Sequence, residues 1–264
     1  MNWHNLFLPS TETERIATLL RESLVELGYN LYNPFDLIPG KAYTQPVRLF
    51  VTPPKDGWTR VLGNPEERVL GTLSNISLCL SLAFDKEKAT IKVYAAGGEG
   101  DVAKLTPYLK PGHTPLDLQK ALTRQIAFET QVDRTDTAIP MSALPDDIQQ
   151  MAKGVNTKQI NKMFGKLMKQ VNRQTSGDEA AARALLAGDA PDWSSSGGRH
   201  ILALTSLLTL PQNWHLLDFV TLRDAYQLHA RRQRNANAQL YPGDAEVMAK
   251  VPDALHYLPI YAGK

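Results

Sequence analysis

Leu78–Phe84 has the sequence LCLSLAF, and this stretch decides the fold class. Large apolar side chains alternate in it with small or polar ones, which is the period of a strand that buries one face. A charged turn follows at Asp85–Lys88, and the alternation resumes with Ile91 and Val93. The pattern predicts an antiparallel hairpin with one buried face.

Helices and further strands are expected before this hairpin. Ser10–Gly28 has apolar residues at helical spacing, and Gly28 is placed to end the helix in a left-handed conformation. Val47–Thr52 and Trp58–Leu62 are expected strands, and Asn64–Glu67 has the proline and acids that begin a second helix. The fold class predicted is α+β, with helices packed on a small, mainly antiparallel sheet in the N-terminal half and a mostly helical C-terminal half.

A domain boundary is predicted at residues 134–145, which carry two prolines and no periodicity. An α+β domain is expected over 1–133 and a helical domain over 146–264. Within the second, Ser194–Gly198 (SSSGG) is expected to be a flexible loop. The proline-punctuated tail, Tyr241–Lys264, is expected to run extended over the surface.

Composition and charge exclude several classes of protein. The 264 residues are 43% hydrophobic and 21% charged, as in ordinary soluble domains. A net charge of +2 means that any contact with nucleic acid or a membrane surface would be local. The single cysteine, Cys79, lies in an apolar run, and Ile201–Leu210 is too short to cross a bilayer. MNWHNLFLPS lacks the features of a signal peptide. A soluble, cytoplasmic protein without membrane contact is expected.

Thr157–Arg173 (TKQINKMFGKLMKQVNR) is predicted to be a basic amphipathic helix. Five cations form a stripe opposite its apolar face, with no acid among them: Lys158, Lys162, Lys166, Lys169 and Arg173. Like charges on neighbouring turns repel unless an anionic surface neutralises them, so the stripe favours an acidic partner. A solvated face is the alternative. A second basic group, Arg231, Arg232 and Arg234, ends the last long helix, where the helix dipole already favours cations.

The leading functional hypothesis is therefore a non-catalytic adaptor or accessory protein whose basic helix contacts an acidic protein partner. The first alternative is nucleic-acid binding. Ile148–Phe164 (IQQMAKGVNTKQINKMF) resembles a helix-turn-helix, with Gly154 at the turn. Gln150 and Lys153 depart from that pattern, because both positions usually hold residues that let the two helices approach.

Signals for catalysis, metals and cofactors are weak, and none of these sites is predicted. The six histidines are scattered and no catalytic motif is present. Gly98–Ala103 fits G-x-G-x-x-A, but it follows a hairpin strand and carries acids where phosphates would bind, so a tight exit from the hairpin is expected. An enzyme with a site between the two halves is kept as the second alternative.

Overall fold

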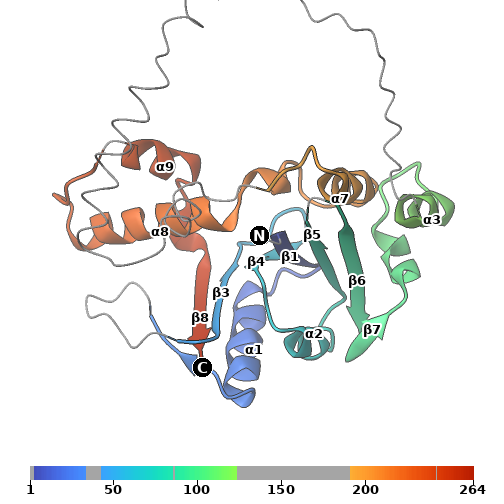
Figure 1. Ribbon diagram of the computed structural model, residues 1–264, viewed down its shortest axis with the longest axis horizontal. Coiled ribbons are helices and arrows are strands. Elements are labelled where there is room, and N and C mark those ends of the chain that lie inside the picture. The colour runs from blue at the N-terminus through green and yellow to red at the C-terminus, as the bar shows by residue number, and fades with distance from the viewer. Residues whose placement is uncertain (1–2, 34–42, 86, 124–190, 242) are drawn as a thin grey trace, which may run out of the picture. The chain divides into compact units, whose positions relative to one another are not determined.

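The computed structural model describes five stretches of the chain: residues 3–33, 43–85, 87–123, 191–241 and 243–264 (Figure 1). The chain divides into two compact units, one made of 1–127 with 190–264 and the other of 128–189. All of the described elements belong to the first unit. The predicted boundary at 134–145 lies outside the described residues.

Within the described residues, eight strands form one sheet in the order β2-β8-β3-β4-β1-β5-β6-β7. Every neighbouring pair of strands is antiparallel. The strands are β1 (Trp3–Leu8), β2 (Asn30–Leu31), β3 (Pro46–Val51), β4 (Thr59–Gly63), β5 (Cys79–Phe84), β6 (Ala89–Ala95), β7 (Gly98–Gly100) and β8 (Leu258–Gly263). The antiparallel sheet and its helices confirm the predicted α+β class, and β5 with β6 confirms the predicted hairpin.

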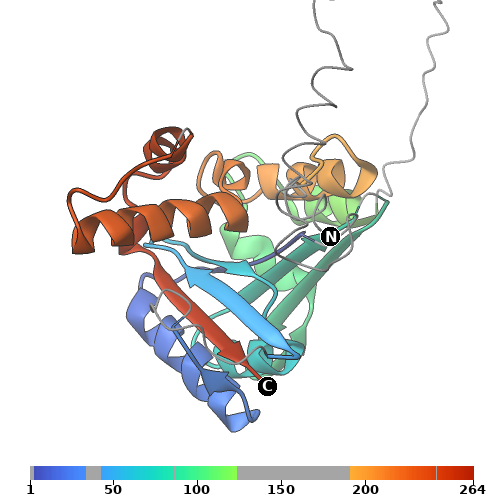
Figure 2. The same ribbon diagram turned by 60° about the vertical axis from the view of Figure 1, so that its left-hand side comes forward.

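Helices cover both faces of this sheet (Figures 1 and 2). The α-helices are α1 (Thr13–Glu26), α2 (Glu67–Leu73), α3 (Pro115–Thr123), α7 (Ser196–Ser206), α8 (Phe219–Arg234) and α9 (Asp244–Lys250). The 3-10 helices are η1 (Val102–Tyr108), η3 (Trp214–Leu216) and η4 (Ala254–His256). Gly28 follows α1 with φ +83°, as its predicted role in ending that helix requires. No described helix combines the length and the apolar character needed to span a membrane.

The core consists of three clusters of buried side chains. On one face of the sheet, α1 and α2 pack over residues such as Leu6 and Val61. On the other face, Leu80 belongs to a cluster with α3, η1 and α7, while Phe50 belongs to one with α8, α9 and η4. Cys79, which the sequence places opposite the buried face of its strand, is fully buried too. The expectation of a single buried face was wrong because helices cover both sides of β5.

Two strands of the sheet come from the ends of the described chain. β1 lies between β4 and β5, although its pattern predicted no element. β8 lies between β2 and β3, where Ile260, Tyr261 and Ala262 are buried. The expected surface course of the tail is therefore wrong. The residues of β8 pack on both faces of the sheet, and an inner strand has partners for its backbone groups on both sides.

Ser194–Gly198 is not a loop but contains the start of α7. Ser195 is the N-cap, and its hydroxyl accepts a hydrogen bond from the Gly198 N–H at 3.1 Å. Both Gly197 and Gly198 are buried. A Cβ on Gly197 would lie 2.3 Å from the carbonyl oxygen of Asp85 in the turn between β5 and β6. The glycines therefore allow helix and turn to approach closely, which is a requirement of packing rather than of flexibility.

Candidate functional site

The predicted basic helix and the helix-turn-helix, Thr157–Arg173 and Ile148–Phe164, lie outside the described residues. The second basic group, at the end of α8, lies within the described residues. Arg231 donates to the carboxylate of Asp244 at 3.2 Å and to the carbonyl oxygen of Gln239 at 2.9 Å. The other two arginines of the group donate to backbone carbonyls four residues away, at 3.3 Å and 3.4 Å. These contacts stabilise the C-terminal end of α8, as the helix dipole also does.

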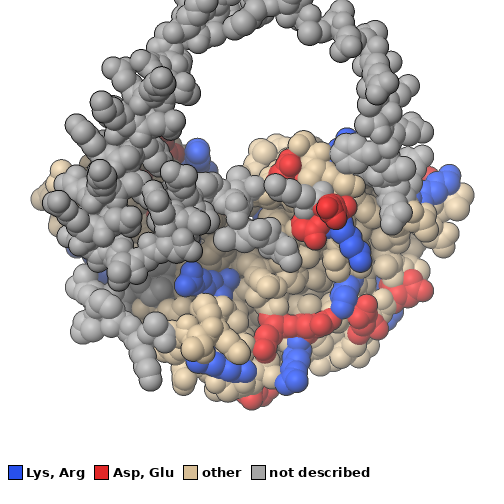
Figure 3. All heavy atoms as spheres, viewed as in Figure 1, with Lys and Arg blue, Asp and Glu red and all other residues tan. Residues whose placement is uncertain are grey.

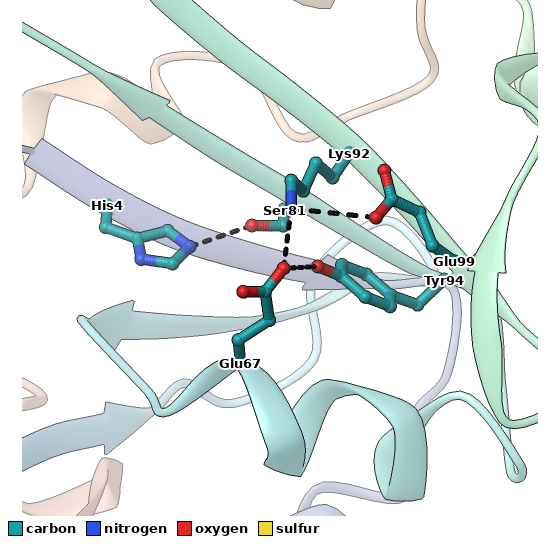
Figure 4. A network of polar contacts seen from close by, with 6 residues as sticks. All are labelled: His4, Glu67, Ser81, Lys92, Tyr94 and Glu99. Atoms are coloured by element: carbon teal, nitrogen blue, oxygen red, sulfur yellow. Dashed lines mark hydrogen bonds and ion pairs between the residues drawn. The ribbon is translucent and has the colours of Figure 1, made fainter.

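A polar network lies at the amino end of α2, where that helix meets β6 and β7 (Figure 4). The carboxylate of Glu67 accepts a hydrogen bond from Lys92 Nζ at 2.5 Å and another from the Tyr94 hydroxyl at 2.9 Å. Lys92 also forms an ion pair with Glu99 at 3.6 Å. Acidic and basic side chains lie side by side on this part of the surface rather than in separate patches (Figure 3).

The contacts favour the ordinary charge states of Glu67, Lys92 and Tyr94 at neutral pH. The hydrogen bond from Lys92, and then the one from Tyr94, lower the pKa of Glu67. The hydrogen bond with Glu67 raises the pKa of Lys92 above its usual value. Burial, followed by the hydrogen bond to Glu67, raises the pKa of Tyr94 to about 12. The network therefore holds a carboxylate, an ammonium group and a neutral phenol. Since Glu67 is exposed and Lys92 is partly exposed, the ion pair contributes little to stability.

A second polar contact set begins beside this network. His4 on β1 contacts Ser81 on β5, with 2.8 Å between its Nε2 and the serine Oγ (Figure 4). On the other side of the ring, Nδ1 lies 2.6 Å from Oδ1 of Asn64. Asn64 directly follows β4, which neighbours β1 in the sheet, so the three side chains come from β1, β5 and the end of β4.

The contacts fix the state of the imidazole. An amide oxygen has no hydrogen to donate, so Nδ1 of His4 carries the ring proton and donates a hydrogen bond to Oδ1 of Asn64. Nε2 then presents its lone pair to the Ser81 hydroxyl, which donates. Burial lowers the pKa of His4, and the hydrogen bond with Asn64 opposes that shift. The histidine is thus a neutral acceptor beside a serine hydroxyl.

Sequence reasoning missed these three residues because they are 17 or more positions apart and match no motif. One signal was available. Ser81 interrupts the face of the hairpin strand that also carries Cys79 and Ala83, and a polar side chain there needs a partner once a helix covers the sheet.

His4 should make the protein less stable in mild acid. Its folded pKa lies below the unfolded value of 6.5, so between the two values the unfolded chain binds more protons. The free energy of unfolding therefore rises with pH in that window and falls as the pH drops through 6.5. We expect His4→Gln to reduce the difference between urea titrations at about pH 5 and about pH 8. His113→Gln, at an exposed histidine, is the control, and an equal reduction there would contradict the assignment.

Arg60, on β4, is a buried charged side chain that donates hydrogen bonds to three acceptors. Only 6% of it is exposed, and its Nε donates to Oδ1 of Asn5 at 2.8 Å. The guanidinium also donates to the carbonyl oxygens of Trp214 and Leu217, the latter at 2.9 Å. Burial lowers its pKa to about 9, against the attraction of Tyr257 and Asp218, so it stays charged at neutral pH. Arg60 thereby holds the η3 segment on the sheet.

Arg60 also completes an aromatic cluster at this end of the sheet. Its guanidinium lies 5.4 Å from the ring centre of Trp214. The rings of Trp3, Trp193 and Trp214 pack against one another with centroids 5.1–5.6 Å apart. Leu216, in the same η3 turn, is 69% exposed. The three tryptophans are partly buried and pack against the core cluster that contains Leu80, so they cover its edge.

The glycine motif, Gly98–Ala103, lies within the described residues, and its surroundings do not resemble a dinucleotide site. Gly98–Gly100 forms β7, an antiparallel edge strand that pairs with β6, instead of the turn of a βαβ unit. The carboxylate of Asp101 accepts the N–H of Ala103 at 2.8 Å, so it occupies a donor that a phosphate would need.

Among the described residues, no group of three or more histidine, cysteine, aspartate or glutamate side chains is placed to hold a metal ion. Two groups of residues in this part of the chain make contacts that could support a function. One is the serine–histidine–asparagine contact, and the other is the exposed turn that Arg60 holds. Comparisons with models of protein families, with curated proteins and with solved structures find no match for the chain.

Proposed function

We propose that this is a soluble, cytoplasmic adaptor or accessory protein that binds an acidic protein partner. The observation that carries the proposal is the stripe of five cations in Thr157–Arg173, which has no acid among them. If these residues form the helix that their spacing predicts, an acidic surface removes the repulsion between their cations and also steers the encounter.

The described residues add support in the form of an exposed apolar contact. Single exposed leucines are common, but Leu216, which is 69% exposed, lies on a turn that Arg60 contacts on both sides of it. The carbonyls that accept from Arg60 belong to Trp214 and Leu217, on either side of it. A side chain displayed on a fixed turn loses less conformational entropy on binding, so it contributes more to affinity than one on a mobile loop.

Fluorescence anisotropy with labelled poly-glutamate tests the proposal. We expect the full chain to bind this probe at low salt and to lose most of its affinity as salt is added. The Lys158/Lys162/Lys166→Ala variant should bind at least about tenfold more weakly, since it loses three of the five cations. The matched control, Lys88/Lys104/Lys120→Ala, removes the same charge from exposed positions of the described unit and should bind as the parent does.

A labelled DNA duplex in the same titration separates the alternative. Nucleic-acid binding through Ile148–Phe164 predicts tighter, steeply salt-dependent binding to the duplex than to poly-glutamate, because cations at the helix-turn-helix contact phosphates. That result would replace the acidic partner by nucleic acid. Failure to bind either polyanion at low salt, or equal losses in both triple variants, would refute the role of the stripe.

A further inference from the structure

Asn64, His4 and Ser81 form a chain of two short contacts across neighbouring strands, with 2.6 Å and 2.8 Å between the interacting atoms. We propose that Ser81 is a nucleophile for acyl transfer from small esters. In this proposal His4 is the general base, and Asn64 is a positioning residue that holds the imidazole.

The geometry fits the roles atom by atom. A general base must lie within about 2.6–3.2 Å of the atom whose proton it takes, and His4 Nε2 lies 2.8 Å from Ser81 Oγ. The base must also be held in the correct tautomer by a third group. Oδ1 of Asn64 does this, because it accepts from Nδ1 and leaves Nε2 as the acceptor.

A cation stands on the same side of the sheet. Lys92 is the register partner of Ser81 in the β5–β6 pair, so both side chains project from the same face. Glu67 and Glu99 hold the ammonium group by contacts of 2.5 Å and 3.6 Å. Because these two carboxylates neutralise the ammonium group, the roles in the reaction rest with Ser81, His4 and Asn64 alone.

The burial of Ser81 limits the size of the acyl group that the substrate can carry. Ser81 is 5% exposed, so a large acyl group would have to displace packed side chains before it reached the hydroxyl. The substrate class is therefore an ester with a small acyl group, such as an acetyl ester, and with a good leaving group.

The reaction balances without any further reactant except water. The oxygen of Ser81 attacks the ester carbonyl while its proton passes to Nε2 of His4. The tetrahedral intermediate then expels the alcohol oxygen, which takes the proton back from His4, and an acyl-serine remains. Water attacks that acyl group, gives a proton to His4, and releases the carboxylic acid as Ser81 Oγ regains its proton.

Acetylation by p-nitrophenyl acetate tests the proposal on the full chain. We expect one acetyl group on Ser81, found by peptide mass spectrometry, together with release of p-nitrophenolate. Ser81→Ala should abolish this modification. His4→Gln should slow it by about 100-fold or more, because the base is lost while the serine remains. Acetyl groups only on lysines, or none on Ser81, would refute the proposal.

Controls separate chemistry from loss of structure. Ser77→Ala removes a nearby hydroxyl that donates to the carbonyl oxygen of Pro9 at 3.4 Å, and it should react as the parent does. Circular dichroism melts identify any variant that does not fold. If Ser81→Ala is such a variant, the His4→Gln rate decides the question, since an unchanged rate in a folded protein overturns the role of the base.

Asn64 needs a readout that a purely structural role would not change. The charged groups that share this side of the sheet near His4 are Lys92, Glu67 and Glu99, and they pair with one another. In Asn64→Asp a carboxylate would face Nδ1 and stabilise the imidazolium. The midpoint of the acylation rate against pH should therefore move upward. An unchanged profile in the folded variant would remove Asn64 from the mechanism.

Discussion

Arg60→Ala is expected to lower the free energy of unfolding by about 3–5 kcal/mol. The change removes a buried cation and leaves its acceptors, Asn5 Oδ1 and the carbonyl oxygens of Trp214 and Leu217, without that donor. The turn that displays Leu216 should separate from the sheet and expose the tryptophan cluster. Urea titration followed by tryptophan fluorescence measures both effects, because the emission of Trp214 shifts to the red as it becomes solvated.

Two further substitutions make this prediction specific. Arg60→Lys keeps the charge but cannot reach all three acceptors with one ammonium group, so we expect a loss of about 1–3 kcal/mol. Arg48→Ala, at an exposed arginine on the neighbouring strand β3, should change stability by less than about 0.5 kcal/mol. If Arg60→Ala cost no more than Arg48→Ala, Arg60 would not be what holds the η3 segment on the sheet.

Gly197→Ala is expected to destabilise the protein by about 3 kcal/mol, although alanine is the better helix former. Its Cβ would lie 2.3 Å from the carbonyl oxygen of Asp85 and 2.8 Å from that of Lys88. The turn that carries these atoms is itself fixed, since the carboxylate of Asp85 accepts the Lys88 N–H at 2.7 Å. Backbone atoms cannot rotate away as a side chain would, so α7 must shift. Thermal and urea unfolding monitored by circular dichroism measure the loss.

Gly98→Ala is the matched control for this prediction. No atom lies within 4 Å of the Cβ that it would gain, and the residue is exposed on the edge strand β7. We therefore expect a change of less than about 0.5 kcal/mol. A stabilised Gly197→Ala variant would mean that helix propensity outweighs the close approach, and that α7 does not pack tightly on the turn between β5 and β6.

The candidate sites divide according to how far apart their residues are in the chain. The stripe in Thr157–Arg173 was found from the sequence because its cations recur every few residues on one predicted helix. The contact of His4 with Ser81 joins residues 77 positions apart, and the contact of Arg60 with Leu217 joins residues 157 apart. No local pattern marks such pairs, because strand order brings them together.

Local patterns in the sequence were enough to predict several elements of this protein, among them β5, β6 and α1. The alternation in Leu78–Phe84 predicted β5, and the helical spacing in Ser10–Gly28 predicted α1, because the period of the side chains along the chain is a property of the element alone. The α+β class followed from the order of these patterns.

Which segments share the sheet depends on pairing between strands that are far apart in the chain. β1 and β8 are as long as β5, but their partners are strands distant in the chain, so their own residues do not show where they pair. The same holds for Gly197, whose role depends on a carbonyl oxygen more than 100 residues earlier in the chain. Buried polar residues such as Arg60 and Ser81 take their meaning from partners that the fold supplies, since a buried polar atom is stable only with a partner.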